Sequence, residues 1–143
     1  MTAHYTKADL SFEYPENWEL DEEVQPPELL EVTVYSPSGA FWSVHFKRPA
    51  VDPGQMTENT LAAMREEYVG LEAEPVTEVV EDAEFIGIDM SFFYLDLPNT
   101  AQVRSLRTSK GTYTILCQAE DDDFERLEAV FRAMTVSLLR SQA

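Results

Sequence analysis

The 143-residue chain has few of the residues on which cross-linking and catalysis depend: one cysteine, Cys117, two histidines and five glycines. A single cysteine excludes an internal disulfide, and the first residues lack the apolar segment of a signal peptide, so we expect a reducing cytoplasmic location. No run approaches the roughly 18 consecutive apolar residues that a membrane-spanning helix requires. The sequence therefore predicts a soluble, cytoplasmic protein.

Catalytic signatures are also missing. Nucleophilic catalysis requires a serine, threonine or cysteine beside a base that a third group orients. Of the two histidines, His4 lies in an N-terminal segment that we expect to be frayed, and His45 is interpreted as an ordinary residue of a strand. Cys117 follows an alternating pattern and is interpreted as a small buried hydrophobic residue. With no Gly-x-Ser-x-Gly, phosphate-binding or dinucleotide motif, the sequence predicts a non-enzymatic protein without catalytic residues.

Basic residues are scarce as well, with ten Lys and Arg against 27 Asp and Glu and a net charge of −17. Because nucleic acids and anionic membranes carry phosphate charge of the same sign, we exclude both as partners. No basic residue lies between Lys7 and Lys47, or between Arg65 and Arg104. We interpret these acidic stretches either as a solvated surface or as a docking face for a basic protein partner. The candidate partner-binding residues are Glu19, Asp21, Glu22, Glu23, Glu28 and Trp42.

Metal and cofactor sites are not predicted. Four acids are contiguous from Glu120 to Asp123, but calcium loops alternate their ligands so that several oxygens converge on one point. Acidic side chains at the start of a helix are instead stabilised by the positive end of the helix dipole. We therefore interpret this run as helix capping and expect no bound metal or cofactor.

The hydrophobic pattern of the first half predicts strands followed by a helix. Leu10 to Tyr14 alternate as in a strand with one buried face, and Trp18 starts a further short strand. A loop is expected at 25–28, and a hairpin at 30–46 with its turn at 36–39. A helix should begin at the cap Thr57 and stop near Gly70.

The second half reads as an antiparallel meander and a closing helix. The expected strands are 76–80, 85–95, 102–108 and 112–119, with turns at 97–100 and 109–111. In residues 88–95 both the odd and the even positions are rich in apolar residues, which is typical of a central strand covered on each side. The last helix starts at Asp121 and buries Phe124, Leu127, Phe131 and Met134, and 136–139 follow as a separate apolar segment.

The opening run Phe12-Glu-Tyr-Pro-Glu-Asn-Trp18 resembles the entry motif of the PsbP-like superfamily, whose members include DcrB-type proteins and Ran-release factors. The resemblance covers about residues 9–139 of a single expected domain, 1–143. It implies an α+β fold, an α/β/α sandwich with a central, mainly antiparallel sheet and two main helices. Trp18 should then be buried against the closing helix.

The resemblance also implies a class of function, because members of the superfamily are mostly non-enzymatic and bind proteins. We therefore expect a small protein-binding domain, chaperone- or adaptor-like, with a homodimer as one expected state. The chain has more aromatic residues than a small core strictly needs. This leaves an alternative open, a small-molecule or lipid-type binding protein with a pocket between the sheet and a helix.

Overall fold

The computed structural model describes residues 1–7, 9–25 and 29–141. The described residues form nine strands and two helices. They are β1 (Thr2–Lys7), β2 (Leu10–Pro15), β3 (Glu19–Gln25), β4 (Leu29–Tyr35), β5 (Phe41–Lys47), α1 (Pro53–Glu67), β6 (Glu72–Val80), β7 (Ala83–Tyr94), β8 (Leu97–Arg107), β9 (Thr112–Glu120) and α2 (Asp121–Ser141).

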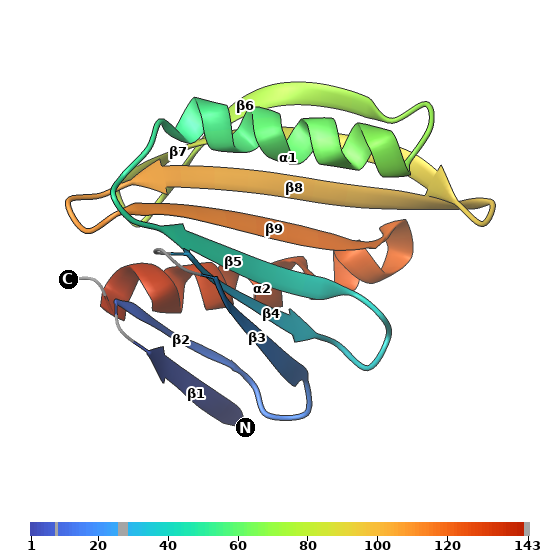
Figure 1. Cartoon of the computed structure of the whole chain (residues 1–143). Helices are drawn as coiled ribbons and strands as arrows, with labels where there is room; N and C mark the ends of the chain where they lie inside the picture. The colour runs from blue at the N-terminus through green and yellow to red at the C-terminus, as the bar shows by residue number, and fades with distance from the viewer. Residues whose placement is uncertain (8, 26–28, 142–143) are drawn as a thin grey trace.

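The elements form three layers around one large sheet (Figure 1). Seven strands lie in the order β3-β4-β5-β9-β8-β7-β6, and every neighbouring pair is antiparallel. Helix α1 packs on one face, the α1 face, and α2 packs on the other, the α2 face, together with the separate β1–β2 pair. The predicted α+β sandwich with a mainly antiparallel sheet is confirmed.

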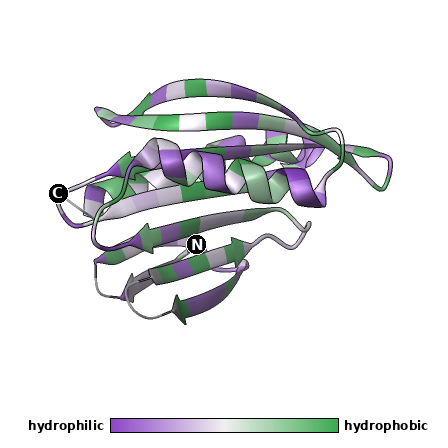
Figure 2. Cartoon of the chain, turned by 45° about the horizontal axis from the view of Figure 1, so that its top comes forward, coloured by the Kyte–Doolittle hydropathy of each residue, from purple (hydrophilic) through white to green (hydrophobic). Residues whose placement is uncertain are grey.

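Two apolar clusters hold the layers together, and side-chain alternation along the strands feeds both (Figure 2). The cluster on the α2 face contains Trp42, Val44 and Phe46 of β5. The cluster on the α1 face joins Leu61 and Met64 of the helix to side chains of β7 and β8. Each strand of the sheet centre therefore contributes its odd and even residues to different layers.

Several sequence predictions are confirmed. The strand from Leu10, the 30–46 hairpin and the turn before Thr112 are all present. Trp18 is only 7% exposed, and its indole meets the ring of Phe131 on α2 edge-on, with 6.1 Å between the centroids. Cys117 is buried, as expected of a small hydrophobic residue.

The N-terminal segment and the start of α1 differ from the predictions. His4 does not lie in a frayed end but on β1, opposite Glu13 of β2, where its ring hydrogen-bonds the hydroxyl of Ser11. The cap of α1 is Asp52, whose carboxylate accepts from the amide of Gln55 ahead of a proline at the first helical position. Thr57, the predicted cap, is buried within the helix.

The later boundaries also move. The turn between β7 and β8 falls at Leu95–Asp96, because both residues adopt positive φ and close a two-residue hairpin. The expected segment 136–139 belongs to α2, since Leu138 continues the helical spacing of Phe131 and Met134 and is buried with them. Strand β7 was expected to be a central strand covered on both sides, but it is second from the sheet edge. Its end is not covered on both sides, because Phe93 is exposed.

We predict that Trp18→Ala lowers the free energy of unfolding by about 3–5 kcal/mol, because it removes a large buried side chain and leaves a cavity against Phe131. Chemical denaturation measures this change against a total stability of about 5–15 kcal/mol. Phe93→Ala, at an exposed aromatic residue, is the control and should stay within about 0.5 kcal/mol. Equal effects of the two substitutions would contradict the assigned packing.

Candidate functional site

The α1 face is only partly covered. Among the described residues, helix α1 packs on β7, β8 and β9, and no other helix or strand packs on the α1 side of β3, β4 and β5. We call this surface the open sheet face. Alternation and strand register assign to it Glu19, Asp21, Glu23, Glu31, Thr33, Tyr35, Phe41, Ser43, His45 and Lys47.

Carboxylates crowd one side of the open sheet face. Glu23 lies directly opposite Glu31 in the β3–β4 register, and Asp21 lies opposite Thr33, the next residue of this face. Burial raises the pKa of Glu31, and the charges of Glu23 and Asp21 raise it further. The three side chains thus form a like-charge cluster, and within the described residues no ion pair neutralises it.

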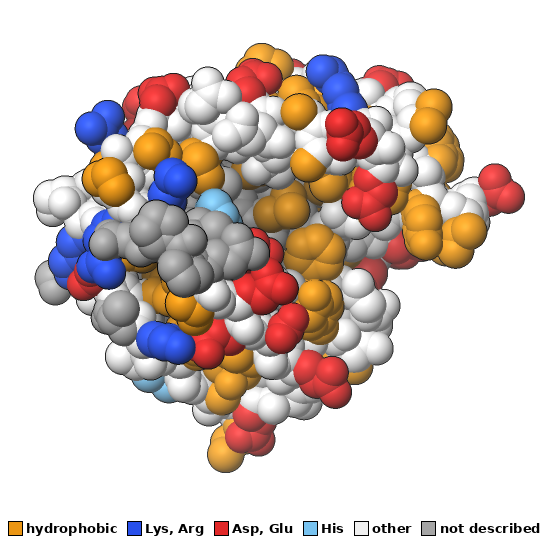
Figure 3. Space-filling model, in the orientation of Figure 1, with side chains coloured by type: hydrophobic (Ala, Val, Ile, Leu, Met, Phe, Trp, Pro, Cys, Tyr) orange, Lys and Arg blue, Asp and Glu red, His pale blue; other side chains and the backbone are white. Residues whose placement is uncertain are grey.

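A groove of about 360 Å³ runs between α1 and the strands beside this cluster. It is lined by Glu31, Ser43, His45, Met56, Asn59, Thr60, Ala63, Met64, Glu67, Thr114 and Leu116. Figure 3 shows the hollow from outside, with acidic and hydrophobic side chains around it. The groove therefore combines an apolar lining with carboxylates on opposite sides, Glu31 from β4 and Glu67 from α1.

His45 lies in this groove directly opposite Glu31. Burial lowers the pKa of His45, and the nearby charge of Lys47 lowers it further, so the ring is neutral near pH 7. Within the described residues no hydrogen bond joins His45 to a hydroxyl group, while Thr33 donates to Ser43 at 3.1 Å. The groove brings a histidine and carboxylates together, but the described residues show no nucleophile–base pair of the kind that catalysis requires.

Aromatic rings continue the open sheet face beyond the groove. Tyr35 is exposed, and its ring lies 6.0 Å from that of Phe41 on the neighbouring strand. Glu19 lies opposite Tyr35 on β3. An exposed ring beside a carboxylate suits an arginine or lysine side chain, which can pair with the acid while it stacks on the ring.

The predicted partner-binding acids do not all lie on one surface. Glu19, Asp21 and Glu23 share the open sheet face, whereas Glu22 points to the opposite side of β3. There it accepts a hydrogen bond from the hydroxyl of Tyr5 and pairs with Lys7 at 3.3 Å. The hydrogen bond from Tyr5 lowers the pKa of Glu22, with a smaller contribution from Lys7. Glu28 lies outside the described residues.

The assignment of Trp42 to the binding surface is wrong. Its side chain is 0% exposed, because it alternates with Phe41 and Ser43 and so faces α2. The indole Nε1 donates to Thr135 Oγ1 at 3.1 Å, and the ring packs 4.8 Å from that of Phe12. A fully enclosed indole is not available to a partner of the folded chain.

Three residues of this surface were not among the candidate binding residues predicted from the sequence: Glu31, Tyr35 and Glu67. Glu31 alternates with the apolar Leu30 and Val32, so the period of the strand already indicated that it faces away from the core. Glu67 gave no comparable signal, because its place at the groove depends on how α1 lies across the sheet.

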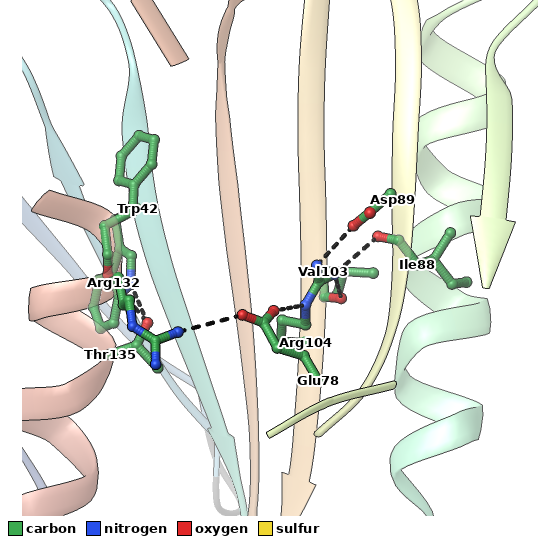
Figure 4. A network of polar contacts seen from close by, with 9 residues as sticks. Trp42, Glu78, Ile88, Asp89, Val103, Arg104, Arg132 and Thr135 are labelled. Carbon is green, nitrogen blue, oxygen red and sulfur yellow. Dashed lines mark hydrogen bonds and ion pairs between the residues drawn. The ribbon is translucent and has the colours of Figure 1, made fainter. Parts of the chain in front are cut away.

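A second cavity, of about 390 Å³, lies between α2 and the α2 face. Three of its charged side chains pair with one another (Figure 4). Arg104 donates to Glu78 at 2.6 Å and to Asp89 at 2.7 Å, and Arg132 lies 3.6 Å from the other oxygen of Glu78. Cys117 also lines this cavity, and burial raises the pKa of its thiol, which therefore stays protonated and unreactive.

The described residues show neither a metal-binding cluster nor a membrane-spanning helix. No cluster of three or more His, Cys, Asp or Glu side chains in the described ranges is placed to hold a metal ion. Neither helix of the described chain has the length and apolar character needed to cross a membrane.

Comparison of the fold with solved structures gives a clear match. The solution structure of cyanobacterial PsbP from Synechocystis sp. PCC 6803 superposes with a TM-score of 0.60, covering 95% of this chain and 90% of that chain at 13% identity. The chain has a PsbP-like fold. No protein-family model matches the sequence, and no curated protein sequence matches it either.

Other structures share the PsbP-like fold. A protein of unknown function from Pseudomonas aeruginosa superposes with a TM-score of 0.55 over 96% of this chain and 95% of that chain, at 9% identity. A Bacteroides thetaiotaomicron protein reaches 0.61 over 94% of this chain but 46% of that chain, at 8% identity. At these identities the similarity shows the fold alone, so function has to be argued from the surfaces of this chain.

We predict that Glu31→Gln raises the free energy of unfolding at pH 7. The folded state binds a proton at Glu31 more tightly than the unfolded chain does, so stability falls as pH rises from the ordinary pKa of 4.5 through the raised folded value. The gain should be largest above the folded pKa and vanish below pH 4.5.

Denaturation curves between pH 4 and pH 8 measure this gain. Glu58→Gln, at an exposed position of α1, removes the same charge away from Asp21 and Glu23 and is the matched control. A gain at Glu31 that is no larger than the control, or that persists at low pH, would contradict the like-charge cluster.

Proposed function

We propose that the open sheet face binds a basic segment of a partner protein, and that the chain is a small, soluble, non-enzymatic adaptor or chaperone-like protein of the cytoplasm. The observation that carries this proposal is the shared face of Asp21, Glu23 and Glu31 beside the groove. Among the described residues of β3, β4 and β5, Lys47 is the one cation on this face, and it lies at the end of β5.

Electrostatics gives the face a preference for a cationic partner. Three carboxylates held together repel each other, and a lysine or arginine placed between them relieves that repulsion when it binds. Exposed pairs of this kind contribute modestly to affinity, but they accelerate association and orient the partner. The acidic cluster therefore favours recognition that weakens as salt rises.

The shape of the surface favours an extended segment. The groove is open along α1 and leads to the rings of Tyr35 and Phe41, so a peptide lying along it could place cationic side chains at the acids and apolar ones in the groove. Apolar contacts with Met64 and Leu116 would supply affinity, while Glu31 and Glu67 would select basic sequences.

A homodimer stays a prediction. Two copies meeting through their open sheet faces would bring like charges together, so the acidic cluster disfavours this surface as the contact between copies. The solvent-exposed acidic face is instead free for a partner of opposite charge.

A small-molecule or lipid-type ligand is the second candidate function. It is favoured by the cavity of about 390 Å³ beside α2, where Val80, Ile115 and Phe131 provide an apolar lining. This volume falls within the range of about 300–1,000 Å³ that is usual for ligand pockets. A small mass that co-purifies with the chain in a native mass spectrum would support this candidate over the first.

We predict that partners purified on the full chain at low salt bind through Lys- and Arg-rich segments. The affinity of the purified complex should fall about tenfold or more between roughly 50 and 300 mM salt, because ions screen exposed charge pairs. The double variant Asp21→Asn with Glu23→Gln should weaken binding about threefold to tenfold at low salt, since it removes two of the attracting charges.

Isothermal titration or fluorescence anisotropy measures both effects. The double variant Glu74→Gln with Glu125→Gln changes the net charge equally at exposed positions of the opposite side and is the matched control. Binding that is insensitive to salt, or equally sensitive to the two double variants, would rule out the open sheet face as the binding surface.

A further inference from the structure

The tip of the β7–β8 hairpin, Phe93–Leu97, presents an exposed apolar surface. Phe93 is 73% exposed, Tyr94 55%, Leu95 78% and Leu97 53%. The hairpin projects at the right-hand end of the molecule in Figure 1, where hydrophobic side chains gather in Figure 3. Contiguous exposed side chains of this size are unusual on a small protein and mark interaction sites.

Turn geometry does not explain these residues. Leu95 and Asp96 have φ of 51° and 63°, and Glu81 and Asp82 of the β6–β7 turn have φ of 50° and 68°. The same chain therefore builds the same turn from two polar residues. A leucine in this left-handed region is disfavoured, because asparagine and glycine adopt it at lower cost.

Packing explains only Tyr94. Tyr94 touches the body of the protein, with its ring edge-on to Tyr68 at 5.9 Å between centroids. Phe93 lies opposite Pro98, and its side chain faces the other side of the sheet from Tyr94, beyond the residues that α2 covers. The tip thus exposes apolar area and holds a leucine at positive φ, although Tyr94 has a ring contact with Tyr68.

The charges around the tip indicate what binds it. Asp96 lies in the turn, Glu72 lies opposite Ser91 at the base of the hairpin, and Glu120 lies opposite Asn99 on the other side. No lysine or arginine occurs on β6, β7 or β9, or on β8 before Arg104. This field repels anionic lipid and a second copy of the chain alike, and it attracts a cationic surface.

We propose that the hairpin tip is a docking knob for a protein partner that presents an apolar pocket rimmed by lysine and arginine. The aromatic and leucine side chains enter the pocket, and Asp96 with the flanking acids meets the basic rim. This contact is separate from the groove, and it holds whether or not a partner uses the open sheet face.

Photo-crosslinking from the full chain in its own cells tests this proposal. A benzophenone amino acid replaces Phe93 in one variant and Val79 in the control. Val79 is also exposed, at 58%, and lies two residues before its turn, as Phe93 does before Leu95. The two probes therefore differ in the composition of the hairpin tip and not in backbone geometry.

The expected result is one protein adduct from position 93 that position 79 does not give, with the cross-linked site in an apolar pocket flanked by lysine or arginine. With that partner purified, Phe93→Ser and Leu95→Asn should each weaken binding about tenfold or more. Leu95→Asn should raise the melting temperature, because asparagine adopts the positive φ of this turn at lower cost. Weaker binding by this variant could therefore not be attributed to a loss of folding. Val79→Ser should leave binding unchanged.

Four outcomes overturn the proposal. They are an adduct with a second copy of the chain, an adduct with lipid, a partner site without basic residues, and no adduct above the Val79 control.

Discussion

The open sheet face follows from one geometric constraint: a single helix is too narrow to cover a seven-stranded sheet. Strands about 4.8 Å apart make this sheet about 30 Å wide, whereas a helix with its side chains is about 10 Å across. On the α2 face two elements together cover the sheet, α2 and the β1–β2 pair. Among the described elements the α1 face has α1 alone, which packs on β7, β8 and β9 and leaves much of the same side of β3, β4 and β5 uncovered, although Ser43 there is buried.

The sequence of the uncovered strands is adapted to that exposure. On their covered side they carry Val32, Val44 and Trp42, and on the open side Glu31, Thr33 and Ser43. Thr33 and Ser43 hydrogen-bond each other there, and within the described residues no ion pair joins Asp21, Glu23 or Glu31 to a basic group. A surface that had only to stay hydrated would not need Asp21, Glu23 and Glu31 to crowd together. This crowding is the physical basis for a basic partner, with the hairpin tip as a second and independent contact.

Local patterns predicted much of the fold, and long-range arrangement was out of their reach. Alternation and turn residues were enough for the 30–46 hairpin and for the helix that begins at Asp121. They could not show that residues 2–7 pair with β2, because pairing depends on a distant packing surface. The cap of α1 was missed although Asp52 before Pro53 is a strong signal, because Thr57 offered a competing one.

The candidate site was predicted in part for the same reasons. Charge alone pointed to β3 but could not separate Glu22, which bonds to Tyr5, from its neighbours. The alternation of side chains along β5 could have placed Trp42 in the core with Val44 and Phe46, because His45 and the other odd positions face the other side of the sheet. The position and lining of the groove were not predictable, because they depend on where α1 crosses the sheet.

The most direct test of the open sheet face is hydroxyl-radical footprinting of the full chain, alone and with its purified partner. In the free chain the exposed Tyr35 should oxidise readily and the half-buried Phe41 to a lesser extent, while Trp18 and Trp42 should stay protected although indoles are more reactive. The partner should protect Tyr35 and Phe41. Protection confined to the α2 side, with oxidation of Tyr35 and Phe41 unchanged, would contradict the account.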